Sequence, residues 1–172
     1  MDGAIDIRRY EALDAAEVRA LFVRVNRLLA PPPLAAGFED YIVRSLAEEI
    51  DRIPDYYGAR QGSFWVARVD GKLFGMFGLE AAGDGAMELR RMYVDPDARH
   101  RGVARAMLAF AEEEARRGNA REMVLSTSEI QKQALALYRN AGYLQVREEI
   151  AADVSNKTIG GGIRRFHFSK AL

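Results

Sequence analysis

The pattern of hydrophobic and polar residues changes period several times along the chain, and each period predicts a kind of element. Apolar residues that alternate with polar ones are typical of half-buried strands, whereas apolar residues three and four positions apart are typical of helices packed on one face. Expected strands cover residues 5–7, 64–69, 72–80, 87–94, 122–127, 143–150 and 164–168. Expected helices run from Asp14 to the residue before Pro31 and over 41–50, 102–117 and 131–141.

Capping and turn residues place the ends of these elements. Asp14 and Glu17 have the spacing of a capping box at the start of the first helix. Pro54 is expected to close the region of the second helix, because proline interrupts helical hydrogen bonding. Asp70-Gly71 predicts a tight hairpin between two strands.

The order of these elements, β-α-α-β-β-β-α-β-α-β-β, predicts an α/β fold with a mixed sheet flanked by helices. A length of 172 residues suits one hydrophobic core. No repeat, low-complexity segment or long linker divides the chain. We therefore expect a single domain over residues 1–172.

Composition narrows the functions that this fold would serve. Lys plus Arg and Asp plus Glu both number 25, so the net charge is zero and favours neither nucleic acid nor acidic membranes. No apolar run approaches the ~20 residues that span a bilayer, and the first residues do not resemble a secretory signal, so a cytoplasmic location is expected. The chain has no cysteine and two histidines. This excludes a cysteine nucleophile, and no metal centre is expected.

A basic turn precedes the helix expected at 102–117. Three arginines cluster around Gly102 at this point, namely Arg99, Arg101 and Arg105. The first N–H groups of a helix lack partners within it and carry partial positive charge, so a helix start attracts anions. Gly102 and Ala104 have no bulky side chain, so a phosphate can approach the backbone there, and the three arginines add charged donors. The spacing therefore favours a pyrophosphate site. A solvated basic turn is the alternative.

Arg99, Gly102 and Ala104 fit a known pattern, Arg/Gln-x-x-Gly-x-Gly/Ala, and so resemble motif A of the GNAT superfamily of acetyltransferases. Residues 91–96 resemble the fourth strand of that superfamily and its exit, and 134–143 resemble its motif B, Ala-x-x-Leu-Tyr-x-x-x-Gly-Phe/Tyr. Three motifs in the same order make the resemblance specific. It implies a mostly antiparallel sheet whose fourth and fifth strands splay apart to admit the pantetheine arm of acetyl-CoA.

The resemblance also implies which residues bind acetyl-CoA. Met92 and Val94 would hydrogen-bond the pantetheine arm through their main chain, as an added strand does. Gln131 stands where relatives often carry asparagine, so its contact with that arm is left open. Arg99 would lie near the pyrophosphate. The pyrophosphate itself would be held by main-chain N–H groups of Arg101, Gly102, Val103, Ala104 and Arg105.

Acetyl transfer to an amine requires a neutral amine, a stabilised carbonyl oxygen and a proton for the departing thiolate. By resemblance, Tyr138 is the candidate general acid at the thioester sulfur, and a tyrosine that only packs is the alternative. Glu88 is the candidate base, with a solvent-facing strand residue as the alternative, and Glu80 is the second candidate. The main-chain N–H of Met92 would serve the thioester oxygen, and Tyr93 would line the acceptor pocket.

Strict alternation along 87–94 predicts which of these side chains share a face of the sheet. It places Leu89, Arg91 and Tyr93 on the face opposite Glu88, Met92 and Val94, unless a bulge interrupts the strand.

The acceptor is expected to be a primary amine of a small molecule or peptide. Acidic residues between 39 and 51 would attract such a cation or form a solvated helix face. Glycines 160–162 permit a tight turn or a close approach to a ligand. A CoA-binding sensor or scaffold without turnover is the alternative function. Nucleic acid is not an expected partner, and Phe166 and Phe168 permit a homodimer through the last strands.

Overall fold

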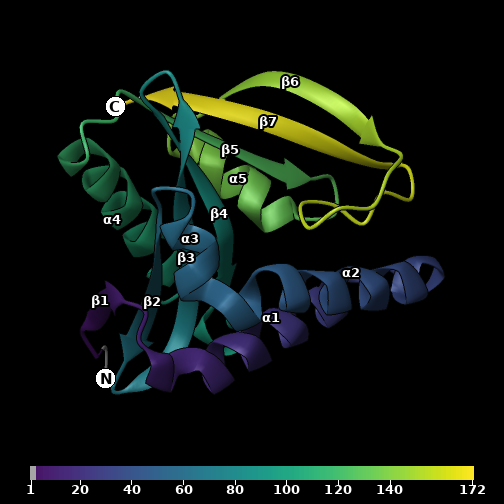
Figure 1. The fold of residues 1–172 in the computed structure, drawn as a ribbon, viewed down its shortest axis with the longest axis horizontal. Helices are drawn as coiled ribbons and strands as arrows, with labels where there is room; N and C mark the ends of the chain where they lie inside the picture. Colours follow the sequence, from purple (N-terminus) through teal and green to yellow (C-terminus); the bar gives the residue numbers. More distant parts are fainter. Residues whose placement is uncertain (1–2) are drawn as a thin grey trace.

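The computed structural model describes residues 3–172, which build a seven-stranded sheet (Figure 1). Met1 and Asp2, where the expected domain begins, lie outside the described residues. The strand order is β1-β2-β3-β4-β5-β7-β6, and every neighbouring pair is antiparallel except β4 with β5. This confirms the mixed, mostly antiparallel α/β sheet. The strands are β1 (Ile5–Arg9), β2 (Ser63–Val69), β3 (Lys72–Gly83), β4 (Ala86–Val94), β5 (Glu122–Ser128), β6 (Leu144–Ala151) and β7 (Ile163–Ala171).

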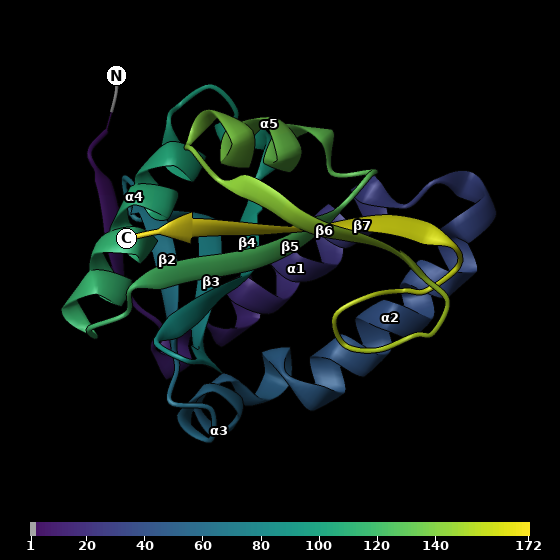
Figure 2. The ribbon, with the colours of Figure 1, turned by 90° about the horizontal axis from the view of Figure 1, so that it is seen from above.

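Helices cover both faces of the sheet, as Figure 2 shows from above. Phe22 and Tyr57 lie in the core between the sheet and the three N-terminal helices, whereas Met107 and Leu135 lie in the core on the opposite face. No helix within residues 3–172 is both long and apolar enough to cross a membrane. The helices are α1 (Ala15–Leu29), α2 (Ala35–Glu48) and α3 (Ile53–Gly58) on one face, and α4 (Val103–Arg117) and α5 (Lys132–Asn140) on the other.

Two predictions about helix ends are wrong. Asp14 makes no capping hydrogen bond to α1; its buried carboxylate instead binds Arg8 at 2.8 Å and Arg68 at 2.7 Å. Pro54 does not close α2, which begins earlier than expected and ends at Glu48. Pro54 lies in the first turn of α3, where its missing N–H removes no helical hydrogen bond.

The two parallel strands separate halfway along their length, which confirms the predicted splay. β4 pairs with β5 only from Ala86 opposite Glu122 to Leu89 opposite Leu125. Beyond these pairs β4 continues to Val94 and β5 to Ser128. The separation opens a gap in the middle of the sheet, and both strands present unpaired edges to it.

A bulge in β4 changes the faces on which its side chains lie. Gly78 pairs with Arg90 and Met76 with Tyr93, so Arg91 and Met92 together lie opposite one residue of β3. Arg91 takes a left-handed backbone, φ +52°. The strict alternation is therefore wrong. Glu88, Arg90, Arg91 and Tyr93 face the N-terminal helices, whereas Leu89, Met92 and Val94 face α4 and α5.

The exposed apolar side chains of the last two strands lie mainly on β6. Phe168 is 1% exposed and belongs to the core, whereas Phe166 is partly exposed, so the homodimer through the last strands stays a prediction. The edge strand is β6, on which Leu144, Val146 and Ile150 are exposed.

Candidate active site

The edge of β4 presents main-chain donors to the gap. The N–H of Asp95 points to β3, where it donates to the carbonyl of Phe74 at 2.8 Å. Successive N–H groups of a strand point to opposite edges, and Tyr93 and Val94 pair regularly with Met76 and Gly75 of β3 after the bulge. The N–H group of Val94 therefore points into the gap, as binding of an extended ligand arm at this edge requires. Met92 belongs to the bulge and lines the gap.

Asp95 fixes the turn that leads from this edge to α4. Its carboxylate accepts from the N–H of Asp97 at 2.9 Å and from the Arg24 guanidinium of α1 at 2.9 Å. Pro96 follows it, so the chain cannot extend β4. The turn thus joins the open edge of β4 to the start of α4 in a fixed geometry.

The start of α4 has the features of an anion site. Gly102 has a left-handed backbone, φ +75°, and no described atom lies within 4 Å of the position that a side chain would take. The first helical bond runs from Ala106 N–H to Gly102 O, so the N–H groups of Val103, Ala104 and Arg105 have no partner within the helix. The Arg101 N–H, also predicted to bind the anion, donates to Ala98 O at 3.3 Å. The side chains of Arg99, Arg101 and Arg105 are exposed around this point.

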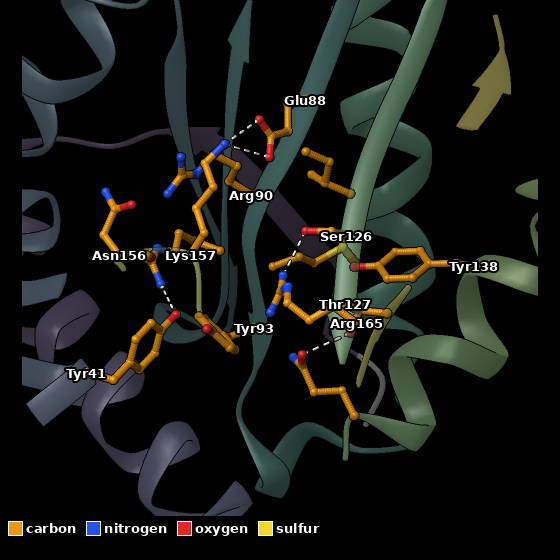
Figure 3. A pocket seen from close by; sticks show the side chains of 14 residues that line it. Tyr41, Glu88, Arg90, Tyr93, Ser126, Thr127, Tyr138, Asn156, Lys157 and Arg165 are labelled. Atoms are coloured by element: carbon orange, nitrogen blue, oxygen red, sulfur yellow. Dashed lines mark hydrogen bonds and ion pairs between the residues drawn. The ribbon is translucent and has the colours of Figure 1, made fainter. Parts of the chain in front are cut away.

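A cavity lies in the gap between β4 and β5 (Figure 3). Tyr138 and Met92 line it from the side of the core beneath α4 and α5. Tyr41 and Tyr93 line it from the side of the N-terminal helices. The cavity therefore joins the two faces of the sheet, so that ligands approaching from opposite faces would meet between the strands.

Tyr138 reaches the cavity from α5. Its ring packs against Tyr143, with centroids 5.8 Å apart, and against Phe168 at 6.3 Å. Its hydroxyl makes no hydrogen bond to another of residues 3–172. Burial raises the pKa of Tyr138 above its ordinary value, so the hydroxyl holds its proton at neutral pH and has that proton free to donate.

Two carboxylates from neighbouring strands lie at the other end of the site. Glu80 of β3 and Glu88 of β4 are paired across the strands. Glu88 lines the cavity, whereas Glu80 is buried and lies 3.2 Å from Arg90. Lys157 from the loop between β6 and β7 lies 3.0 Å from Glu88 and 3.7 Å from Glu80. Of the two candidate bases, Glu88 is therefore the one that faces the cavity.

Gln131 precedes α5 and also lines the cavity. Its side-chain oxygen accepts from Thr127 Oγ1 at 2.9 Å and from the N–H and hydroxyl of Ser128, both at 3.2 Å. The longer side chain of glutamine thus reaches back to the end of β5 and fixes the start of α5 there.

Comparison with known proteins matches residues 27–143 to the model of the Acetyltransferase (GNAT) family. The chain belongs to this family.

Relatives of this GNAT chain include N-acetyltransferase 8 of Homo sapiens, 31% identical over 110 residues that cover 60% of this chain and 48% of that protein. N-acetylaspartate synthetase of Danio rerio is 34% identical over 110 residues, covering 63% and 39% respectively. The chain spans about half the length, or less, of these relatives. A solved GNAT acetyltransferase of Staphylococcus aureus Mu50 has a TM-score of 0.75 over 98% of this chain and 99% of its own, at 17% identity. That likeness shows the fold.

The GNAT motifs do not reveal the ion network beside the cavity. Glu49 of the acidic stretch 39–51 is fully buried. For this residue both predictions are wrong, because it neither lies on a solvated helix face nor is free to attract a cationic acceptor. It accepts from Arg90 at 3.0 Å and Arg91 at 2.7 Å, and from the Tyr57 hydroxyl at 2.6 Å. Burial alone would raise the pKa of Glu49, but the two arginines outweigh it and lower that pKa. The bulge in β4 places Arg91 beside Arg90 on the face of the sheet that the N-terminal helices cover.

Sequence reasoning singled out none of the cavity residues Tyr41, Lys157 and Arg165 of this GNAT chain. Lys157 belongs to the loop that ends in glycines 160–162, all with positive φ. The loop lies against α2 in both views (Figures 1 and 2), and its Asn156 carbonyl accepts from Arg91. The glycine run was the one signal for this loop, and it identified neither the lysine nor its partner.

Proposed function

We propose that this chain transfers the acetyl group of acetyl-CoA to a primary amine of a small molecule or peptide. The observation that carries the proposal is the separation of β4 and β5 beyond Leu89, which leaves unpaired N–H groups on the edge that leads to α4. Membership of the GNAT family supports acetyl transfer. The name of the relative N-acetylaspartate synthetase is consistent with a small amine acceptor.

The residues at the open edge fit acetyl-CoA. The N–H groups of Met92 and Val94 would bind the pantetheine arm as a further strand would. The free N–H groups of Val103, Ala104 and Arg105 would bind the pyrophosphate, aided by the partial positive charge of the helix start. The open space beside Gly102 admits a phosphate close to the backbone.

Two side chains would move the protons of the reaction. Glu88 takes a proton from the acceptor ammonium, because only the neutral amine has a lone pair for attack. As the new N–C bond forms and the C–S bond breaks, Tyr138 gives its proton to the sulfur, which leaves with the electron pair. The remaining excess proton on nitrogen passes to solvent, Glu88 releases the proton that it took, and Tyr138 recovers one. The Met92 N–H would stabilise the carbonyl oxygen as its charge grows. The step needs no covalent enzyme intermediate.

Acceptor-dependent thiol release tests this function. The protein is incubated with acetyl-CoA and a panel of amino acids, peptides and polyamines, each with a blank that lacks amine, and acetylated product is identified by mass spectrometry. At least one amine should raise thiol release above the blank and yield its N-acetyl product. Tight acetyl-CoA binding without any amine-dependent release would instead favour a CoA-binding sensor.

A further inference from the structure

Arg165 differs from the other cations of the cavity. It lies on β7 opposite Ser128, the last residue of β5, and its Nη2 donates to the Ser126 hydroxyl at 2.8 Å. Figure 3 shows it between β5 and Tyr93, in the lining of the cavity. No carboxylate oxygen of residues 3–172 lies within 4.0 Å of its guanidinium nitrogens.

The neighbouring cations all have carboxylate partners. Arg90 and Arg91 share Glu49, at 3.0 and 2.7 Å. Arg90 also binds Glu80, and Lys157 binds Glu88 at 3.0 Å. Four cations therefore meet three carboxylates around the cavity, and the charge left over is that of Arg165.

No carboxylate of residues 3–172 is in direct contact with the Arg165 guanidinium. Taking a charge out of water is costly unless an opposite charge or several hydrogen bonds replace the solvent. Burial lowers the pKa of Arg165 from its ordinary value and outweighs the opposite effect of Tyr41, Tyr93 and Glu149, the residue opposite it on β6. One hydroxyl satisfies one of its five donors. The guanidinium thus has free donors in the cavity for an incoming anion.

We propose that Arg165 binds a carboxylate of the acceptor, which makes the acceptor a primary amine that also carries a carboxylate, as an amino acid does. The inference rests on the proposed acetyl transfer and names its substrate class. Glu88 and Arg165 line the same cavity, so the ammonium and the carboxylate of one molecule would each meet the opposite charge. One unpaired positive charge matches a carboxylate better than a phosphate monoester, which carries about −1.5 to −2.

Binding of reaction products to the protein with CoA tests the carboxylate contact without requiring turnover. The probes are N-acetyl derivatives of the common amino acids and the same compounds with the carboxylate converted to an amide, titrated by NMR. The variants are Arg165→Gln, Arg165→Lys and, as a matched control, Arg164→Gln. Arg164 is the exposed neighbour that pairs with Glu148 at 2.7 Å.

The wild-type protein should bind at least one acid roughly tenfold to a hundredfold more tightly than its amide, the range of a charge-assisted hydrogen bond. Arg165→Gln should abolish that preference, Arg165→Lys should keep part of it, and Arg164→Gln should keep all of it. The inference is overturned if no probe binds, if acid and amide bind equally, or if the preference survives in Arg165→Gln.

A kinetic comparison separates this inference from the proposed function. Amino acids should be acetylated faster than their amides by wild-type protein, although amidation makes the amine less basic and so more available as the neutral form. If acetyl-CoA binds and amides are acetylated as well as acids, the carboxylate inference fails while acetyl transfer stands. If acetyl-CoA does not bind at all, the proposed function fails first.

Discussion

The ammonium nitrogen of Lys157 lies 3.0 Å from one carboxylate oxygen of Glu88 and 3.2 Å from the other. Lys157 is part of the loop between β6 and β7, and its side chain is 46% exposed, so it can move away from Glu88. In the proposed reaction an acceptor ammonium takes that position beside Glu88. In that reaction Lys157 would compete with the acceptor ammonium for Glu88.

Replacing Lys157 should make acceptor binding easier. In Lys157→Met the Glu88 carboxylate loses its internal partner, and the KM for a cationic amine should fall by up to about fivefold, in line with the strength of a partly exposed ion pair. Lys157→Arg keeps the charge and should keep the KM. Steady-state kinetics at low ionic strength measures both. A KM that rises in Lys157→Met would show that the lysine assists binding.

Glu88 and Glu80 should differ in their contribution to turnover. Glu88→Gln should lower kcat/KM at neutral pH by at least about 100-fold, as loss of a general base does. Alkaline pH should restore much of the rate, because the acceptor is then already neutral. Glu80→Gln should cost much less, since Glu80 is buried behind Arg90. Profiles of kcat/KM against pH for both variants show which glutamate is the general base. A larger loss in Glu80→Gln than in Glu88→Gln would assign that role to Glu80.

Tyr138→Phe should lower kcat by about 100-fold while acetyl-CoA affinity is retained, because the phenyl ring keeps its packing and only the proton donor is lost. Its free energy of unfolding should not fall, since the hydroxyl has no partner among residues 3–172 to lose.

Tyr143→Phe is the matched control for that measurement. Its hydroxyl donates to Glu112 at 3.0 Å, so the variant should lose about 1 kcal/mol of stability and keep its kcat. If Tyr143→Phe lowered kcat as much as Tyr138→Phe, a structural role would explain both.

The sequence predicts the sheet and the donor site better than the acceptor site, for a physical reason. Strand alternation, helix periodicity and the glycine at position 102 are local signals, so β4, α4 and the proposed anion site between them follow from neighbouring residues. The contact between Glu49 and Arg91 joins positions 42 apart, and Lys157 and Glu88 are 69 apart. No local period specifies such pairs. The bulge at Arg91 reversed the expected faces of Met92 and Val94 because one added residue shifts all that follow.

Asp14 should make stability depend on pH in the acidic range. Burial alone would raise its pKa, but hydrogen bonds from Arg8 and Arg68 outweigh burial and lower the pKa from 3.8 to about 2. A carboxyl whose pKa is lower in the folded state stabilises the fold above its unfolded pKa and loses this as pH falls through the folded value. At pH 7, Asp14→Asn should cost about 2 kcal/mol of unfolding free energy.

That cost should shrink steadily as pH falls from about 4 to 2, because wild-type Asp14 then becomes neutral as well. Urea unfolding at several pH values measures it. Asp6→Asn, at an exposed position of β1, is the control and should show almost no cost at any pH. A cost for Asp14→Asn that stayed constant down to pH 2 would contradict the ion-pair account.

We propose that the start of α4 binds the pyrophosphate of acetyl-CoA. Calorimetric titration of acetyl-CoA into the wild-type protein, Ala104→Glu and Ala104→Gln tests this binding site. A carboxylate in the first helical turn stabilises the helix but repels a bound pyrophosphate. The glutamate variant should therefore be at least as stable as wild type and bind acetyl-CoA at least about tenfold more weakly, while the glutamine variant, equal in size, should bind nearly as wild type does. Equal affinities in the two variants, or no binding by folded wild-type protein, would show that the start of α4 does not bind the pyrophosphate.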